Sequence, residues 1–171
     1  MKTHRFSADG TVKFHWPPNL TQWVGKRALV SLALDAVQTL DESASLTSPK
    51  GRMTPGLKTL LTLLTYCYSA GIHGSQEIER AIESDPTVRY LCAHKYPDAV
   101  TLRRFRREHR DQIKHCLAHV LTQAWAAQLE AGEASYLDYG WFEKDFTQQV
   151  QDAAEDRLTL AVVMDEMVSD Q

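Results

Sequence analysis

A segment that is apolar on nearly every side places the strongest limit on the fold of this chain. Residues 54–71 read TPGLKTLLTLLTYCYSAG, with five leucines followed by the run YCY. Thr54 is a favourable N-cap, Pro55 suits the first helical position, and Gly71 suits the left-handed residue that ends a helix. A helix without a polar face has to be surrounded by other helices. The segment therefore predicts an all-α helical bundle with this helix at its centre.

The neighbouring segments also have helical patterns. Between residues 21 and 40, apolar side chains recur every three or four positions, which is typical of an amphipathic helix. Residues 41–53, DESASLTSPKGRM, favour a loop because Ser, Thr, Pro and Gly cluster there. Three helices are predicted after the central one, capped in turn by Ser75, Asp85 and Asp98. Two short helices before a long basic one is the order of a helix-turn-helix DNA reader, so we expect the bundle to contain such a unit.

The two ends of the chain differ from this bundle. Residues 1–20 are predicted to form a short extended arm, in which an Asp-Gly turn signal between THRF and TVKF favours a small hairpin. In residues 132–171, apolar side chains such as Phe146 and Val150 fit helical spacing, which predicts an acidic helical C-terminal tail. We therefore divide the chain into an arm (1–20), a helical DNA-binding domain (21–131) and an acidic extension (132–171).

Charge is distributed unevenly along the chain. The formal net charge is −3, but residues 1–129 hold 17 Lys and Arg against 11 Asp and Glu, whereas residues 130–171 hold 2 against 11. A basic body is typical of a protein that meets a polyanion. An acidic extension can solubilise the chain, contact a protein or compete for the basic surface.

Composition excludes several other classes of protein. With 171 residues, 43% of them hydrophobic, the chain can bury one ordinary core and is not of low complexity. The longest apolar segment, residues 57–68, is too short to span a bilayer, and the N-terminus lacks the apolar run of a signal peptide. Cys67, Cys92 and Cys116 form an odd set without a C-x-x-C pair. We therefore expect a soluble cytoplasmic protein with reduced thiols and no membrane contact.

The most charged segment is TLRRFRREHR, residues 101–110, which contains five arginines. At about 100° per residue, one helix running from Ala99 past residue 120 would collect its apolar side chains on a single face. These side chains are Leu102, Phe105, Ile113, Cys116 and Val120. A second stripe would contain Arg103, Arg107, Arg110 and Lys114. Neighbouring cations on a helix repel by roughly 0.2–0.5 kcal/mol per pair, so the stripe indicates a negatively charged partner.

The alternative interpretation is a solvated face, or one paired within the chain. Glu77, Glu79 and Glu83 are the acids available for such pairing. Arg106 lies nearer the core edge, where we expect it to reach a carboxylate or a carbonyl, whereas Arg104 lies off the stripe.

Metal and catalytic sites are not favoured by the sequence. CAH at residues 92–94 and HCLAH at residues 115–119 supply two thiols and three imidazoles, but their spacings match no common zinc finger. Buried thiols and surface histidines are the better interpretation. Since no catalytic triad or phosphate-binding glycine loop is indicated, we expect no metal and no cofactor.

Several ordered blocks carry a resemblance to a known family. They are the leucine-rich helix ending in YSAGIHGSQEIERA, the block VRYLCA, and the signature D-x-x-T-L-x-R-F-R-R-x-H from Asp98 to His109. Together with the upstream WPPNLTQWVGKRALVSLALDAVQTLD, they resemble the N-terminal (InsH-type) domain of bacterial DDE insertion-sequence transposases over roughly residues 14–131. The resemblance implies an all-helical domain that binds the transposon's terminal DNA, in a nucleoid-associated bacterial protein.

The chain departs from that family after Glu130. Family members continue into an RNase H-like domain, in which two aspartates and a glutamate hold two metal ions. The remaining residues are too few for that fold, and Asp165, after the strand-like TLAVVM, is followed by Glu166 where the family has Gly-Thr. We therefore expect a non-catalytic double-stranded DNA-binding protein, either a regulator of transcription recruited from a transposase or a transposase remnant.

Nine residues are the candidate DNA contacts, and none is assigned a catalytic role. They are Arg103, Arg107, Arg110, Lys114, Arg104, Thr101, Ser75, Gln76 and Lys95. The alternative function is a protein-interaction module or inhibitor, pairing through residues 134–171 with a full-length transposase, another partner or a second copy. A third is a nuclease or recombinase subunit that needs a catalytic partner.

Overall fold

The computed structural model describes residues 4–6, 12–47, 53–131 and 143–169, and within them the fold is all-α apart from one hairpin. The hairpin pairs β1 (His4–Phe6) with β2 (Val12–Phe14) antiparallel, with His4 opposite Phe14, as the arm's turn signal predicted. The helices are α1 (Thr21–Thr47), α2 (Pro55–Ser69), α3 (Ser75–Ser84), α4 (Pro86–Leu91), α5 (Ala99–Glu108), α6 (Arg110–Glu130) and α8 (Glu143–Ser169).

Helix α2 is the centre of the bundle, as its apolar sequence predicted. Every residue from Leu61 to Ser69 is buried, and α2 contacts α1, α4, α6 and α8. The Thr54 hydroxyl accepts a bond from the Leu57 N–H at 3.3 Å, and Gly71 after the helix has a φ of 84°. A Cβ at Gly71 would also approach the Pro18 carbonyl oxygen to 3.2 Å, so the positive φ favours glycine and the close packing adds to that preference.

Helix α1 is longer than predicted and bends near its start. Gly25, with φ 82° and ψ 162°, breaks the helical geometry after the first turn. The predicted loop at residues 41–53 is wrong in its first half, because α1 continues to Thr47. Tertiary contacts outweigh the loop-like composition there: buried Asp41 pairs with Lys58 Nζ at 2.7 Å and accepts the Met53 N–H at 2.7 Å.

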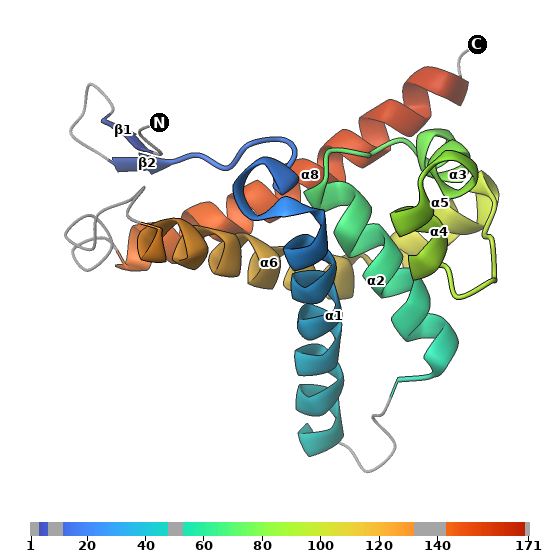
Figure 1. The fold of residues 1–171 in the computed structure, drawn as a ribbon, viewed down its shortest axis with the longest axis horizontal. Helices are drawn as coiled ribbons and strands as arrows, with labels where there is room; N and C mark the ends of the chain where they lie inside the picture. Colours follow the sequence, from blue (N-terminus) through green and yellow to red (C-terminus); the bar gives the residue numbers. More distant parts are fainter. Residues whose placement is uncertain (1–3, 7–11, 48–52, 132–142, 170–171) are drawn as a thin grey trace.

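The elements segregate along the molecule (Figure 1). Helices α3, α4 and α5 gather at one end, the hairpin lies at the other, and α6 and α8 extend between them. Helix α3 contacts both α4 and α5. The charged segment on α5 is therefore carried by a three-helix unit that projects from the central bundle.

The C-terminal helix completes the core. Apolar residues of α8 are buried against α6, α2 and α3, namely Phe146, Val150, Ala154, Leu158 and Ala161. Phe14 of the arm joins them, with its ring 4.9 Å from that of Trp125 and 5.0 Å from that of Phe146. The segment TLAVVM, which has a strand-like composition, lies inside α8 and is helical. The packing of the long helix on α6 outweighs the β-branched composition of this run.

Arg157 of α8 forms hydrogen bonds with two other segments of the chain. Its guanidinium donates to the carbonyls of Pro17 at 2.7 Å and Pro18 at 2.9 Å, and to those of Tyr68 at 2.7 Å and Ser69 at 3.3 Å. Burial lowers the pKa of Arg157 to about 10. The arm, the end of α2 and α8 therefore meet at one buried cation. None of the described helices combines the length and apolar character needed to cross a bilayer.

Candidate nucleic-acid interface

The basic segment is two helices in the structure, not one. Helix α5 ends at Glu108 and α6 begins at Arg110, while His109 has φ −122° and ψ 28°. The His109 N–H donates to the Phe105 carbonyl at 2.9 Å, and its own carbonyl accepts the Ile113 N–H at 3.0 Å. Helical hydrogen bonds therefore continue through His109, but its backbone angles leave the α region, so the prediction of one continuous helix is wrong. The four-cation stripe divides into Arg103 and Arg107 on α5, and Arg110 and Lys114 on α6.

Helix α5 has one buried and one outward face. The buried side chains are Ala99, Leu102, Phe105 and Arg106. The outward side chains, at spacings of three and four, are Val100, Arg103, Arg104 and Arg107. Val100, Arg104 and Arg107 are exposed, and Arg103 is half-buried. Arg104, which the single-helix wheel placed off the stripe, therefore belongs to the outward face of α5.

The carboxylates at the start of α5 accept hydrogen bonds from its backbone N–H groups. Asp98 Oδ1 accepts the Thr101 N–H at 2.8 Å, and this bond lowers the pKa of Asp98. Glu79 of α3 accepts the Ala99 N–H at 2.8 Å. Glu79 was a candidate partner for the arginines, but it satisfies the first N–H of α5 instead. Among the described residues, the three outward arginines make no ion pair.

The two cations on α6 are paired within the chain. Glu155 of α8 forms an ion pair with Arg110 and a second one with Lys114 Nζ at 3.3 Å. These contacts lower the pKa of Glu155, with the Arg110 hydrogen bond as the largest cause. One carboxylate of the acidic extension is thus shared by both cations in this half of the predicted stripe.

Ser75 and Arg106 belong to a buried polar network. Asp165 of α8 accepts the Ser75 N–H and hydroxyl, each at 2.7 Å, and pairs with Arg106. Arg106 also donates to the Ala161 carbonyl at 3.5 Å, which confirms its expected role at a carboxylate and a carbonyl. Gly74, not Ser75, is the N-cap of α3. Ser75 is fully buried, so its side chain does not face solvent as a DNA contact requires.

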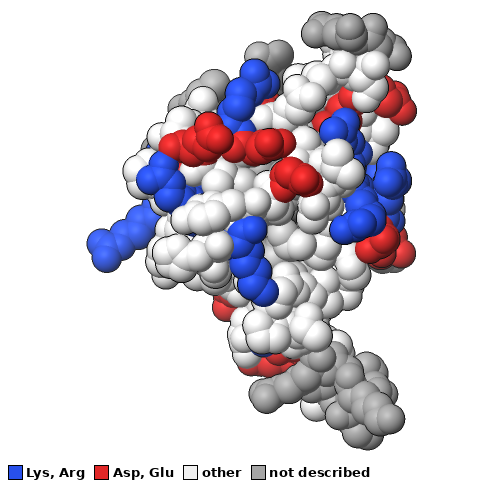
Figure 2. All heavy atoms as spheres, turned by 90° about the vertical axis from the view of Figure 1, so that its right-hand side faces the viewer, with Lys and Arg blue, Asp and Glu red and all other residues white. Residues whose placement is uncertain are grey.

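The other candidate residues lie around the three-helix unit. Gln76, in the first turn of α3, and Lys95, in the turn between α4 and α5, are exposed, and Thr101 is half-buried. Figure 2 views the α3–α5 end and shows basic side chains in several groups, with acidic side chains between them. Negative charge thus interrupts the positive charge on this end, and the basic side chains do not form one continuous patch in this view.

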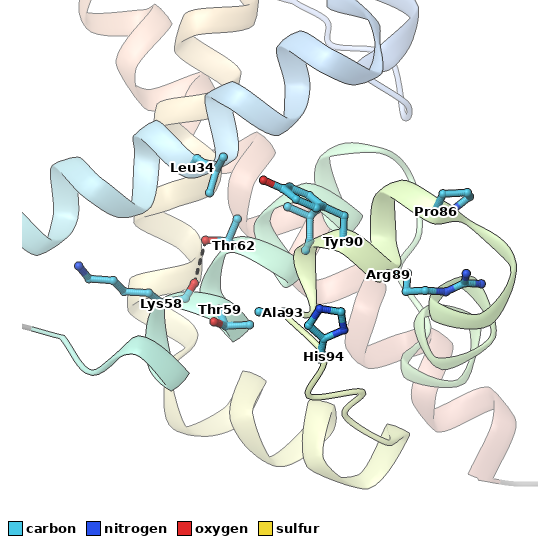
Figure 3. Close-up of a pocket in the computed structure, with 10 residues that line it drawn as sticks. Leu34, Lys58, Thr59, Thr62, Pro86, Arg89, Tyr90, Ala93 and His94 are labelled. Atoms are coloured by element: carbon cyan, nitrogen blue, oxygen red, sulfur yellow. Dashed lines mark hydrogen bonds between the residues drawn. The ribbon is translucent and has the colours of Figure 1, made fainter.

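A groove of about 600 Å³ lies between α1, α2 and α4. Figure 3 shows Leu34 and the ring of Tyr90 facing one another across it. Two long cations line the groove, but Lys58 pairs with Asp41 and Arg89 donates to carbonyls near the end of α3. Both cations that line the groove therefore make contacts that stabilise the fold.

The side chains that resembled a metal site are dispersed. Cys67, Cys92 and Cys116 are buried free thiols, and burial raises the pKa of each. In the part of the chain that the structure describes, no three His, Cys, Asp or Glu side chains are grouped to hold a metal ion.

The comparisons with known proteins give a family for this chain. A family model described as a transposase domain (DUF772) matches residues 22–108, slightly more than half of the chain. The match runs from the start of α1 to the last residue of α5, so it contains the whole three-helix unit and the outward face of α5. No curated protein and no solved structure matches significantly. The chain belongs to the transposase domain family DUF772.

Proposed function

We propose that this protein binds double-stranded DNA, with α3–α5 acting as a helix-turn-helix-like unit and α5 as its recognition helix. One observation carries the proposal: α5 turns Arg103, Arg104 and Arg107 outward while its other face is buried in the core. Unpaired cations on one helix face are held together at an electrostatic cost, and a polyanion removes that cost. The resemblance to the InsH-type domain, whose members bind transposon ends, favours the same function.

The candidate residues then take different roles. Arg103, Arg104 and Arg107 would contact phosphates and base edges, and exposed Gln76 and Lys95 and half-buried Thr101 would contact the flanking backbone. Arg110 and Lys114 would contribute only after they separate from Glu155. Ser75 would act through the fold, because it holds α3 to α8.

We infer that the protein acts by binding, without strand cleavage. Asp165, the acid closest to a catalytic position by sequence, is buried in contact with Ser75 and Arg106, so its oxygens are already used. Regulation of transcription and control of transposition both fit a DNA-bound protein of this kind. Either role would place the protein in the cytoplasm, at the nucleoid.

A mobility-shift titration of duplex DNA across a salt series tests the function. We expect binding at low salt. The logarithm of the binding constant should fall linearly with the logarithm of the salt concentration, with a slope of about −0.9 for each phosphate that the protein neutralises. Arg103→Ala combined with Arg107→Ala should reduce that slope by about 2. Arg27→Ala combined with Lys26→Ala is the matched control, because it removes the same charge from exposed positions of α1. Absent binding at low salt, or equal loss in both variants, would refute the proposal.

A second candidate function is pairing with another copy of the chain through α8. Leu160, Val163 and Met167 are 44%, 41% and 62% exposed and follow helical spacing on α8. Because deleting residues 134–171 would remove core side chains, the test is Leu160→Gln with Met167→Gln, which alters only the exposed face. Sedimentation equilibrium should show a dimer that this variant loses; a wild-type monomer at all concentrations would exclude the pairing.

A further inference from the structure

The outward face of α5 is not uniformly basic, because its first turn carries an apolar side chain. Val100 is 66% exposed and lies one turn before Arg104. The other apolar residues of this helix, Ala99, Leu102 and Phe105, are buried. Val100 therefore contributes little to the core, and its position places it among the arginines of the candidate interface.

The directions of these side chains separate them into two groups. At 100° per residue, the buried residues of α5 define a core direction, and Arg104 and Val100 point within roughly 10° and 30° of its opposite. Arg107 and Arg103 point roughly 50° and 90° away from the direction opposite the core, both on the same side of it. Val100 and Arg104 form the crest of α5, and Arg103 and Arg107 form one flank. The half-buried position of Arg103 agrees with this division.

We propose that the crest reads base edges, with Val100 contacting the C5 methyl group of a thymine and Arg104 donating to O6 and N7 of a guanine. The inference rests on the proposed DNA-binding function and adds which chemical groups are recognised. A helix that lies in the major groove directs its crest toward the base edges and its flanks toward the phosphates. Arginine suits guanine because its forked donors match two acceptors, and the thymine methyl group is the apolar feature of that groove.

The two sides of the crest carry opposite charges. Arg103 and Arg107 lie on one side of the crest, and exposed Glu108 lies on the other, roughly 50° away. A phosphate strand is attracted by the first flank and repelled by the second, so the helix should lean toward one strand. This asymmetry supports a phosphate role for Arg103 and Arg107, and it leaves base contacts to the crest.

The spacing along α5 limits the sequence that is read. Val100 and Arg104 are four residues apart, which is about 6 Å along a helix that rises 1.5 Å per residue. Base pairs of B-DNA are stacked about 3.4 Å apart. Two base pairs is the span for a helix parallel to the DNA axis and an inclined helix spans fewer, so we expect the thymine and the guanine to lie within about two base pairs of one another.

The test begins with selection of binding sites from a random duplex library by the full chain. The preferred site should contain a T and a G at about this separation. Replacing that thymine with deoxyuridine removes only the methyl group and should weaken wild-type binding about fourfold, whereas Val100→Ala should bind both duplexes equally. Replacing the guanine with 7-deazaguanine removes one acceptor, and should weaken the wild type but not Arg104→Ala. Arg107→Ala is the control variant, expected to lose affinity for all duplexes alike while it keeps both sensitivities.

The outcomes distinguish this inference from the function on which it rests. If the wild type binds duplex DNA without sequence preference, or tolerates deoxyuridine at every thymine, crest readout is wrong although DNA binding stands. If Val100→Ala is as sensitive to the methyl group as the wild type, another residue reads the thymine and the assignment fails. If the wild type does not bind DNA at all, both proposals fail together. Circular dichroism of Val100→Ala should match the wild type, because the side chain is outside the core.

Discussion

Asp165→Ala is the substitution whose effect on stability follows most directly from the structure. The side chains of Asp165 and Arg106 are 7% and 6% exposed, and the carboxylate also accepts two bonds from Ser75. Removing the carboxylate leaves a guanidinium buried without its counter-charge, and leaves both Ser75 donors unpaired. Breaking a buried pair from one side costs about 3–5 kcal/mol, which is a large part of the 5–15 kcal/mol that typically holds a domain folded.

Urea denaturation at 25 °C, followed by tryptophan fluorescence, measures this loss. The matched control is Glu166→Ala, the exposed neighbour on the same helix, for which we expect a change within about 0.5 kcal/mol. The double variant Arg106→Met with Asp165→Leu should recover part of the stability, because it removes both charges and keeps the volume, while the two Ser75 donors stay unpaired. A loss below about 1 kcal/mol in Asp165→Ala, similar to the control, would show that the network does not hold α8 to the three-helix unit.

Three further predictions concern α8 and its neighbours. Glu155→Gln should tighten DNA binding several-fold and steepen the salt dependence by about one phosphate contact, since it frees Arg110 and Lys114; an unchanged slope would exclude these cations from the interface. Arg157→Met should cost about 2–4 kcal/mol in urea denaturation, because the carbonyls of Pro17, Pro18 and Tyr68 lose their donor, whereas that of Ser69 keeps the Leu20 N–H; a loss below about 1 kcal/mol would contradict this. Burial lowers the pKa of His73 from 6.5 to about 4. Between these two pH values the imidazole is mostly neutral in the folded protein and mostly protonated in the unfolded chain. Stability contributed by neutral His73 is therefore present above pH 6.5 and lost as the pH falls toward 4. His73→Phe, which retains a ring to stack on Tyr68, should lose less stability than the wild type between pH 7.5 and 4.5, whereas equal losses would show that His73 is not responsible.

Local signals in the sequence predicted the parts of the fold that local physics determines. The caps and the apolar run of α2 are such signals, because a Thr-Pro start, a glycine stop and the absence of a polar face act within one helix. The inward direction of Arg106 followed from helical periodicity over a few turns. Each of these features is set by residues within a few positions of one another.

Long-range contacts determine what the sequence could not predict. No proline or glycine lies near His109, and the apolar spacing of α5 and α6 fits one continuous wheel, so the break had no local signal. Serine is a favourable N-cap residue, but Ser75 instead donates hydrogen bonds to Asp165, which lies ninety positions later in the chain. Arg104 was a candidate contact that lay off the predicted stripe, and the structure places it on the exposed face of α5 with Val100.

The uneven charge of the sequence has a different meaning once these pairings are known. The acidic extension supplies Asp165 to Arg106, and Glu155 to both Arg110 and Lys114, so two carboxylates of α8 pair with three cations of the basic body. Because the same helix buries its apolar face in the core, it is part of the folded domain, and truncating it would unfold the protein before it exposed a binding surface. Single charge substitutions on α8 are therefore the appropriate test of competition. The outward arginines of α5 are not paired with α8, and this is why we propose that face, and not the whole arginine-rich segment, as the surface for a polyanion.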